Sequence, residues 1–187
     1  MQFTSIFLAS SFFCPRAESI QDFRNPTKEI MTSIKDISKV NVRPFTPADR
    51  EACLSVFDSN TPEYFDTEER DDFAVFLDAG QPHFFVATTP DETVIACGGY
   101  YLDPLHGVAG LTWGMVHRSW HRHGVGSILL KHRIAAIENS HKARVVRVNT
   151  SQQSRGFFER HGFRVLKVIP DGYAPGIDRV ETEMELK

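Results

Sequence analysis

The hydrophobic pattern of this chain changes period at Val116, and that change constrains the fold more than any other feature. Before it, residues 83–89, 93–102 and 108–116 are short runs rich in β-branched and aromatic residues, which predicts three strands. After it, Gly124-Val125-Gly126 opens a segment whose apolar residues recur every three or four positions, which predicts a helix. A strand that leads through a glycine turn into a helix indicates a mixed α/β architecture.

The flanking segments continue the alternation of strands and helices. We expect, in order, strand 40–45, helices from about residues 46 and 67, the three strands above, the helix from 124, strand 144–150, helix 154–161, and strands 163–169 and 180–186. Thr46, Pro47 and Asp49 have the residue types of a helix cap, in which Asp49 answers Thr46 from the third position. No repeat or linker interrupts residues 40–187, so one α/β domain is predicted.

Residues 1–30 stand apart from this pattern. The apolar run from Phe3 to Phe13 is shorter than the roughly 20 residues that cross a bilayer, and no Lys or Arg precedes it as in an export signal. We expect a disordered extension, with a misassigned start or a weak signal-like segment as the alternatives. No membrane association is predicted.

The overall charge excludes a general polyanion binder. The chain has 21 Lys and Arg against 24 Asp and Glu, a net charge of −3, whereas nucleic-acid binders usually carry a basic excess. The three cysteines are far apart and form no CxxC pair, which is typical of a reducing compartment, so a cytoplasmic location is expected.

The charges are nevertheless segregated along the chain. Positions 104–137 contain no Asp or Glu, and His121-Arg122-His123-Gly124-Val125-Gly126-Ser127 lies among them, where the strand meets the helix. A helix N-terminus has unpaired N–H groups and a partial positive charge, and glycines let an anion approach the backbone. This segment therefore predicts a phosphate or pyrophosphate site. No Gly-Lys-Ser/Thr follows, which excludes a P-loop, and Leu129 stands where a dinucleotide fingerprint needs its third glycine.

Two motifs extend this interpretation. The first runs from Met115 and Val116 through His121-Arg122-His123-Gly124-Val125-Gly126, and the second is Phe157-Phe158-Glu159-Arg160-His161-Gly162-Phe163. With them, residues 40–187 resemble the GNAT superfamily of acyl-CoA-dependent N-acyltransferases. The resemblance implies a mixed, mostly antiparallel sheet of six or seven strands flanked by about four helices.

The resemblance also implies the roles of particular residues. It implies that acetyl-CoA is held as co-substrate by Met115, Val116, His117, His121, Arg122, His123, Gly124, Val125, Gly126, Ser127, Ser151 and Phe158. Here Met115 to His117 would lie along the pantetheine arm, and the amides of residues 122–127 would hold the pyrophosphate. The acetyl group would pass by direct attack to a primary amine, on a small molecule or a protein.

Three positions depart from the family pattern. His121 replaces an Arg or Gln, Ser151 replaces an Asn common in the family, and Phe158 replaces the Tyr that commonly protonates the departing thiolate. Because Phe158 has no proton to donate, a catalytically weak or inactive acyl-CoA-binding sensor is the alternative function. A homodimer is left open.

Candidate catalytic groups are few, because strand 108–116 contains no carboxylate. We rank Tyr173, on the glycine-rich segment 170–176, and Tyr101 first as substrate-site tyrosines, and His117 at the strand end is the third candidate. His117, His121 and His123 are not accompanied by a carboxylate or Cys, so no metal site is predicted.

Overall fold

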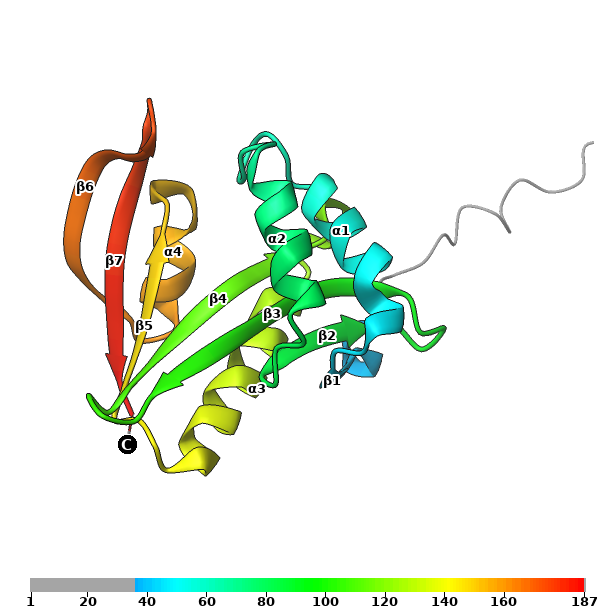
Figure 1. Ribbon diagram of the computed structural model, residues 1–187, viewed down its shortest axis with the longest axis horizontal. Helices are drawn as coiled ribbons and strands as arrows, with labels where there is room; N and C mark the ends of the chain where they lie inside the picture. Colours follow the sequence, from blue (N-terminus) through cyan, green and yellow to red (C-terminus); the bar gives the residue numbers. More distant parts are fainter. Residues whose placement is uncertain (1–35, 187) are drawn as a thin grey trace, which may run out of the picture. The chain divides into compact units, whose positions relative to one another are not determined.

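The computed structural model describes residues 36–186, so the expectation for residues 1–30 lies outside them (Figure 1). The helices are α1 (Arg50–Asp58), α2 (Glu69–Asp78), α3 (Val125–Ser140) and α4 (Gln152–Arg160). The strands are β1 (Asn41–Pro44), β2 (Phe84–Thr88), β3 (Val94–Asp103), β4 (Val108–Val116), β5 (Val145–Thr150), β6 (Arg164–Ala174) and β7 (Ile177–Glu185). Short 3-10 turns cover Ile37–Lys39, Pro47–Asp49 and Arg118–Trp120.

The strands form one seven-stranded sheet in the order β1-β2-β3-β4-β5-β7-β6. Every neighbouring pair is antiparallel except β4 and β5, which are parallel. A parallel pair needs a crossover connection, and α3 supplies it between these two strands. The predicted mixed, mostly antiparallel α/β fold is confirmed.

The helices cover both faces of the sheet. On one face, Phe57 of α1 and Phe73 of α2 pack with Met115 of β4 in a fully buried aromatic cluster. On the other face, Leu130 of α3 belongs to a second buried cluster, against which Phe157 of α4 packs. Figure 1 shows α1 and α2 together on the side of the sheet opposite α3. Helices α3 and α4 therefore share the face onto which the glycine turn opens.

The first helix begins as its capping residues predict. The Asp49 carboxylate accepts hydrogen bonds from the Thr46 backbone N–H at 2.8 Å and from the Thr46 hydroxyl at 2.8 Å. Arg43 of β1 donates two further bonds of 2.8 Å to the same carboxylate. These bonds hold the pKa of Asp49 down at about 2, with the Arg43 bond as the largest cause.

Most of the glycine-rich segment 170–176 is part of a strand, whereas the sequence predicts a loop there. Strand β6 continues to Ala174, which pairs with Ile177, so Tyr173 lies on a strand near the tip of the β6–β7 hairpin. The Asp171 carboxylate accepts a bond of 2.6 Å from the Gly176 N–H. From α4, Gln152 donates to the Gly176 carbonyl at 2.7 Å and accepts from the Asp178 N–H at 3.0 Å. These long-range bonds order the hairpin, and local sequence patterns do not reveal them.

Candidate functional site

The site begins where two central strands separate. Strand β5 pairs with β4 only at Val108, Ala109 and Gly110, although both strands continue beyond these pairs. On the other side of β4, the His117 N–H bonds to the Ile95 carbonyl of β3 at 2.8 Å. Because N–H groups alternate sides along an antiparallel strand, the N–H of Val116 faces β5, where no strand pairs with it. The end of β4 therefore presents a backbone donor to the space between the strands.

The carbonyl of Val116 is fixed by two side chains. Asn60, at the end of α1, donates its side-chain amide at 2.9 Å, and His121 approaches with Nε2 at 2.9 Å. The His121 ring also lies 5.4 Å from the Tyr64 ring, edge to face. The side chain of His121 thus holds the turn in place, and its backbone N–H donates to the Arg118 carbonyl at 3.2 Å.

The turn after β4 has the backbone conformation of an anion cradle. Arg122 has a φ of 62° and Gly124 a φ of 86°, and α3 starts directly afterwards. Left-handed residues in series with a helix N-terminus turn successive N–H groups toward one point. Val125 is fully buried in the core, so only its backbone is available to a ligand. An ideal Cβ on Gly126 would lie 3.5 Å from Phe157 of α4 and 3.6 Å from Val116, so Gly126 lies where α3, α4 and β4 come together.

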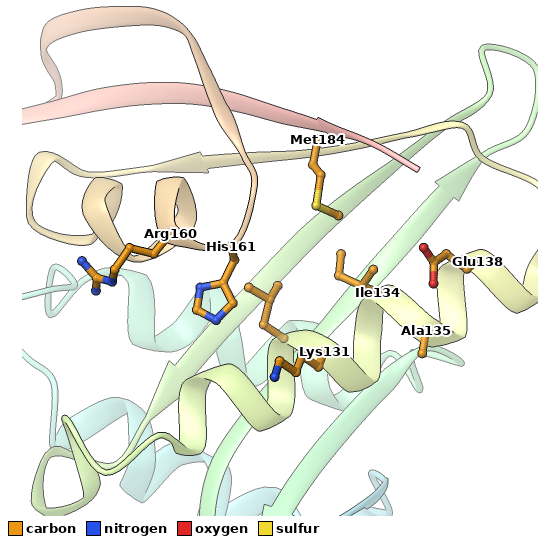
Figure 2. Close-up of a pocket in the computed structure, with 8 residues that line it drawn as sticks. Lys131, Ile134, Ala135, Glu138, Arg160, His161 and Met184 are labelled. Carbon is orange, nitrogen blue, oxygen red and sulfur yellow. The ribbon is translucent and has the colours of Figure 1, made fainter. Parts of the chain in front are cut away.

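A basic pocket adjoins this cradle. Its volume is about 480 Å³ and its lining comes from α3, the end of α4 and β7. Figure 2 shows Lys131 of α3 and the neighbouring residues Arg160 and His161 at the pocket, with Glu138 at its other end. Within residues 36–186, Lys131, Arg160 and the exposed Arg122 form no ion pair, whereas Arg118 pairs with Glu63. This region therefore has free positive charge for an anionic ligand.

Several residues assigned to the cofactor have structural contacts of their own. The Met115 side chain is buried in the cluster under α1, and Phe158 packs edge to face against Phe163 at 5.4 Å. Ser151 precedes α4, and its carbonyl accepts from the Ser154 and Arg155 N–H groups. His123 reaches back to the His121 carbonyl at 2.7 Å. The side chains of Met115, Phe158 and His123 are thus engaged within the protein, whereas the contacts of Ser151 are made by its backbone carbonyl and its hydroxyl makes no cap bond to α4.

The three catalytic candidates occupy different environments. Tyr101 is 58% exposed and its ring lies across Gly110. Tyr173 is 52% exposed, and its pKa is raised above the usual 10, mainly by partial burial and also by Glu69 of α2 and Glu181 of β7, against the opposing effect of Arg179. His117 accepts a hydrogen bond from the Ser119 N–H at Nδ1, 3.2 Å away, which caps the turn Arg118–Trp120. The tyrosines are thus accessible, and His117 is engaged in the backbone of the turn.

Residues 36–186 contain neither a metal cluster nor a membrane-spanning helix. No group of three or more His, Cys, Asp or Glu side chains is arranged to hold a metal ion in this part of the chain. Among its helices, none has both the length and the apolar character to cross a membrane.

Comparison with known proteins identifies the family. The sequence profile of the Acetyltransferase (GNAT) family matches residues 53–163, which include both motifs and the separated strands. The chain belongs to this family of acetyltransferases.

Solved structures of acetyltransferases have the same fold as this chain. A GNAT-family protein from Desulfovibrio desulfuricans is 25% identical, with a TM-score of 0.67 over 78% of this chain and 98% of that one. The yncA protein from Salmonella typhimurium, solved with its cofactor acetyl-CoA, is 16% identical, with a TM-score of 0.64 over 79% and 94%. The Escherichia coli ribosomal-protein-S18-alanine N-acetyltransferase is 15% identical, with a TM-score of 0.66 over 79% and 94%. No curated protein sequence matches.

Sequence reasoning missed four residues that the structure brings to this region. Asn60 reaches Val116 from 56 positions away, and Lys131, Arg160 and His161 meet only because α3 and α4 pack on the same face. The missing carboxylates of positions 104–137 indicated a basic region. Nothing local indicated which basic residues from a second helix would join it.

Proposed function

We propose that this protein transfers the acetyl group of acetyl-CoA to a primary amine by direct attack. The observation that carries the proposal is the unpaired end of β4 directly followed by the glycine cradle at α3. The amide groups of a pantetheine arm fit an unpaired strand edge, because such an edge offers alternating N–H and C=O groups. The cradle and the free Arg122 suit a diphosphate.

The chemistry requires a donor for developing negative charge. The amine nitrogen forms a bond to the thioester carbonyl carbon, and the carbonyl electron pair moves onto oxygen. That oxygen needs an N–H donor that is already in position, and the Val116 N–H faces the required space; one such donor is worth about 3 kcal/mol in other acyl transfers. The C–S bond then breaks, the thiolate leaves with its electron pair, and the proton of the former amine replaces the acetyl group on sulfur, directly or through a relay.

A proton relay can use Tyr173. Its raised pKa keeps the phenol protonated at neutral pH, so it serves as an acid and not as a base. Glu69 and Glu181 are close enough to affect this pKa, and both are negative groups that favour binding of an amine that arrives as a cation and loses its extra proton to solvent before it attacks. Tyr173 thereby replaces the acid that Phe158 cannot supply. Tyr101 is the second candidate tyrosine for the proton relay. We assign His117 a structural role, in which its side chain caps the turn Arg118–Trp120.

The adenosine end of CoA is assigned to the basic pocket. A bond between Ser127 and His161, of 3.0 Å from Oγ to Nε2, connects the first turn of α3 to the pocket wall. Lys131 and Arg160 form no ion pair with residues 36–186, which leaves their charges for the 3′-phosphate of CoA.

The test is a thiol-release assay with acetyl-CoA and a panel of small amines and peptide N-termini, after calorimetry with acetyl-CoA. We expect binding and release that depends on one class of amine. No binding of acetyl-CoA or CoA would refute the proposal.

A second function is favoured by the packing of Phe158. Its ring contacts Phe157 at 5.1 Å and Phe163 at 5.4 Å, so a purely apolar group occupies the place of the usual acid. A non-catalytic acyl-CoA sensor would bind acetyl-CoA tightly and release no thiol with any amine. The same assay therefore separates the two functions. Cys53 and Cys97 are buried free thiols, which supports a cytoplasmic location for either one.

A further inference from the structure

Arg133 of α3 is a buried cation. Only 4% of the residue is exposed. Its guanidinium makes two long hydrogen bonds, from Nε to the Leu129 carbonyl and from Nη1 to the Gly99 carbonyl, both of 3.4 Å. A guanidinium has five N–H donors, and residues 36–186 accept only these two long bonds from it.

No carboxylate neutralises this cation within the described part of the chain, where Arg133 forms no ion pair. Burial lowers the pKa of Arg133 to about 10, and the nearby Cys97 thiol acts weakly in the opposite direction. The group remains charged at neutral pH. A buried and unpaired charge costs folding free energy, so its position in the core calls for an explanation other than stability.

The sheet is shaped around this guanidinium. An ideal Cβ on Gly98 of β3 would lie 2.9 Å from Nη1, and one on Gly114 of β4 would lie 2.9 Å from Nη1 and 3.1 Å from Nη2. A side chain at either position would displace the guanidinium at the flexible end of Arg133, so glycine at both positions leaves the observed place of the guanidinium free. Glycine within a strand is itself destabilising by about 0.5–1 kcal/mol. Each of the two strands thus contains a destabilising glycine, and the two glycines together leave room for the guanidinium.

Gly98 and Gly114 belong to a β-bulge between β3 and β4, in the part of β4 that does not pair with β5. Cys97 pairs with Met115 and Gly99 with Thr112, so Gly98 alone faces both Trp113 and Gly114. Trp113 has a φ of 45°, a conformation that costs energy for a residue with a side chain. Gly114 is exposed, whereas the guanidinium behind it is buried. The charge therefore lies directly behind the accessible backbone of β4, past the last pair with β5.

We propose that Arg133 is a positioning residue for acyl transfer, whose guanidinium fixes a positive charge behind the Trp113–Gly114 bulge and so favours negative charge on an acyl oxygen at the end of β4. This inference rests on the proposed function, because the acyl oxygen is placed there by acetyl-CoA. A charge held in a low-dielectric environment acts strongly on a nearby oxygen and needs no rearrangement during the reaction.

The experiment compares Arg133→Met with Leu129→Met. Both residues are buried on α3, one turn apart, and both variants introduce the same side chain, but only the first removes the charge. Infrared spectroscopy of bound acetyl-CoA, labelled with carbon-13 at the carbonyl, reports the field on the oxygen. We expect the carbonyl stretch of Arg133→Met to move to higher wavenumber than in the wild type, with the control unchanged.

Thiol release, with the best amine or with water as acceptor, should fall about 10- to 100-fold in Arg133→Met. Its affinity for CoA should stay within about twofold of the wild type, since a field on the acyl oxygen acts on the transition state. Arg133→Gln, which is polar but uncharged, is the second neutral variant and should show the same changes.

The outcomes are distinct. An unchanged carbonyl stretch and rate in both neutral variants would overturn the role of Arg133 while leaving the proposed function standing. Failure of both neutral variants to fold would show that the guanidinium is a structural group, and would also overturn it. Wild-type protein that does not bind acetyl-CoA would contradict the proposed function itself.

Discussion

His161, directly after α4, is hydrogen-bonded to Ser127 in the first turn of α3, with 3.0 Å between Nε2 and Oγ. The other ring nitrogen, Nδ1, lies 2.8 Å from the Phe157 carbonyl and must donate to it. In the neutral imidazole, Nε2 is then the acceptor and the Ser127 hydroxyl the donor. The two helices that border the proposed cofactor site are therefore joined by one side-chain pair.

Breaking this pair should destabilise the protein modestly. A net contribution of about 0.5–1.5 kcal/mol is typical of such a bond. Urea unfolding of Ser127→Ala, His161→Phe and the double variant gives the interaction energy of the pair. We expect the double variant to lose less than the sum of the single losses. Additive losses would mean that the bond does not couple α3 and α4.

Substitutions at Gly126 test the proposed diphosphate site without straining the backbone. Gly124 has a positive φ, so any side chain there is strained, whereas a Cβ on Gly126 makes ordinary contacts. Gly126→Ala should fold normally and bind CoA. Gly126→Glu should lose at least about tenfold in affinity for CoA, because a bulky, negatively charged side chain would lie beside the proposed diphosphate site. Calorimetry with CoA checks both, and equal affinities would contradict the placement of the cofactor.

The basic pocket predicts selectivity for the 3′-phosphate. The double variant Lys131→Ala/Arg160→Ala should bind CoA about tenfold more weakly, yet bind dephospho-CoA as the wild type does. Arg155→Ala is the matched control, because Arg155 lies on α4 but pairs with Glu159 at 2.9 Å. An equal loss for both ligands would place the adenosine end elsewhere.

Asp49 should make stability depend on pH in the acid range. Its pKa falls from 3.8 unfolded to about 2 folded, so its contribution is complete above about pH 5 and disappears as the pH falls below 2. The shift corresponds to about 2 kcal/mol. Urea unfolding across this range should show a steeper loss in the wild type than in Asp49→Asn. Parallel curves would refute the role of Arg43 in lowering this pKa.

Tyr173 and Tyr101 can be distinguished by removing one hydroxyl at a time. Loss of a general acid costs about 100-fold or more, so Tyr173→Phe should reduce kcat strongly and leave CoA affinity unchanged. Because the pKa of Tyr173 is raised, the wild-type rate should not fall through its ionisation below pH 10. Tyr101→Phe is the comparison, and a larger loss there would transfer the acid role to Tyr101.

The sequence was sufficient for features that depend on neighbouring residues. The cap at Asp49 and the glycine turn at Gly124 each follow from a few consecutive positions, and both are present. The strand order could be expected only through the family resemblance, because pairing between distant strands leaves no local pattern.

Features that depend on contacts between distant segments could not be predicted. Tyr173 lies on a strand because Gln152, 24 positions from Gly176, bonds to the hairpin tip. His121 was assigned to cofactor binding, but its ring is directed at the Val116 carbonyl. Arg133 lies four residues from both Leu129 and Ile137 on the buried side of α3, but no local pattern indicates that its guanidinium lies against the glycines of two strands.

Because β4 pairs with β5 over only three residues, β4 combines properties of a central strand and of an edge strand. It is a central strand by its position in the sheet and an edge strand by its hydrogen bonds beyond Gly110. The backbone amide of Val116 should therefore exchange with deuterium far faster than amides of β3, although both lie mid-sheet. An unsatisfied edge also attracts other extended chains, so the ligand that completes it would protect the protein from self-association as well as take part in its chemistry.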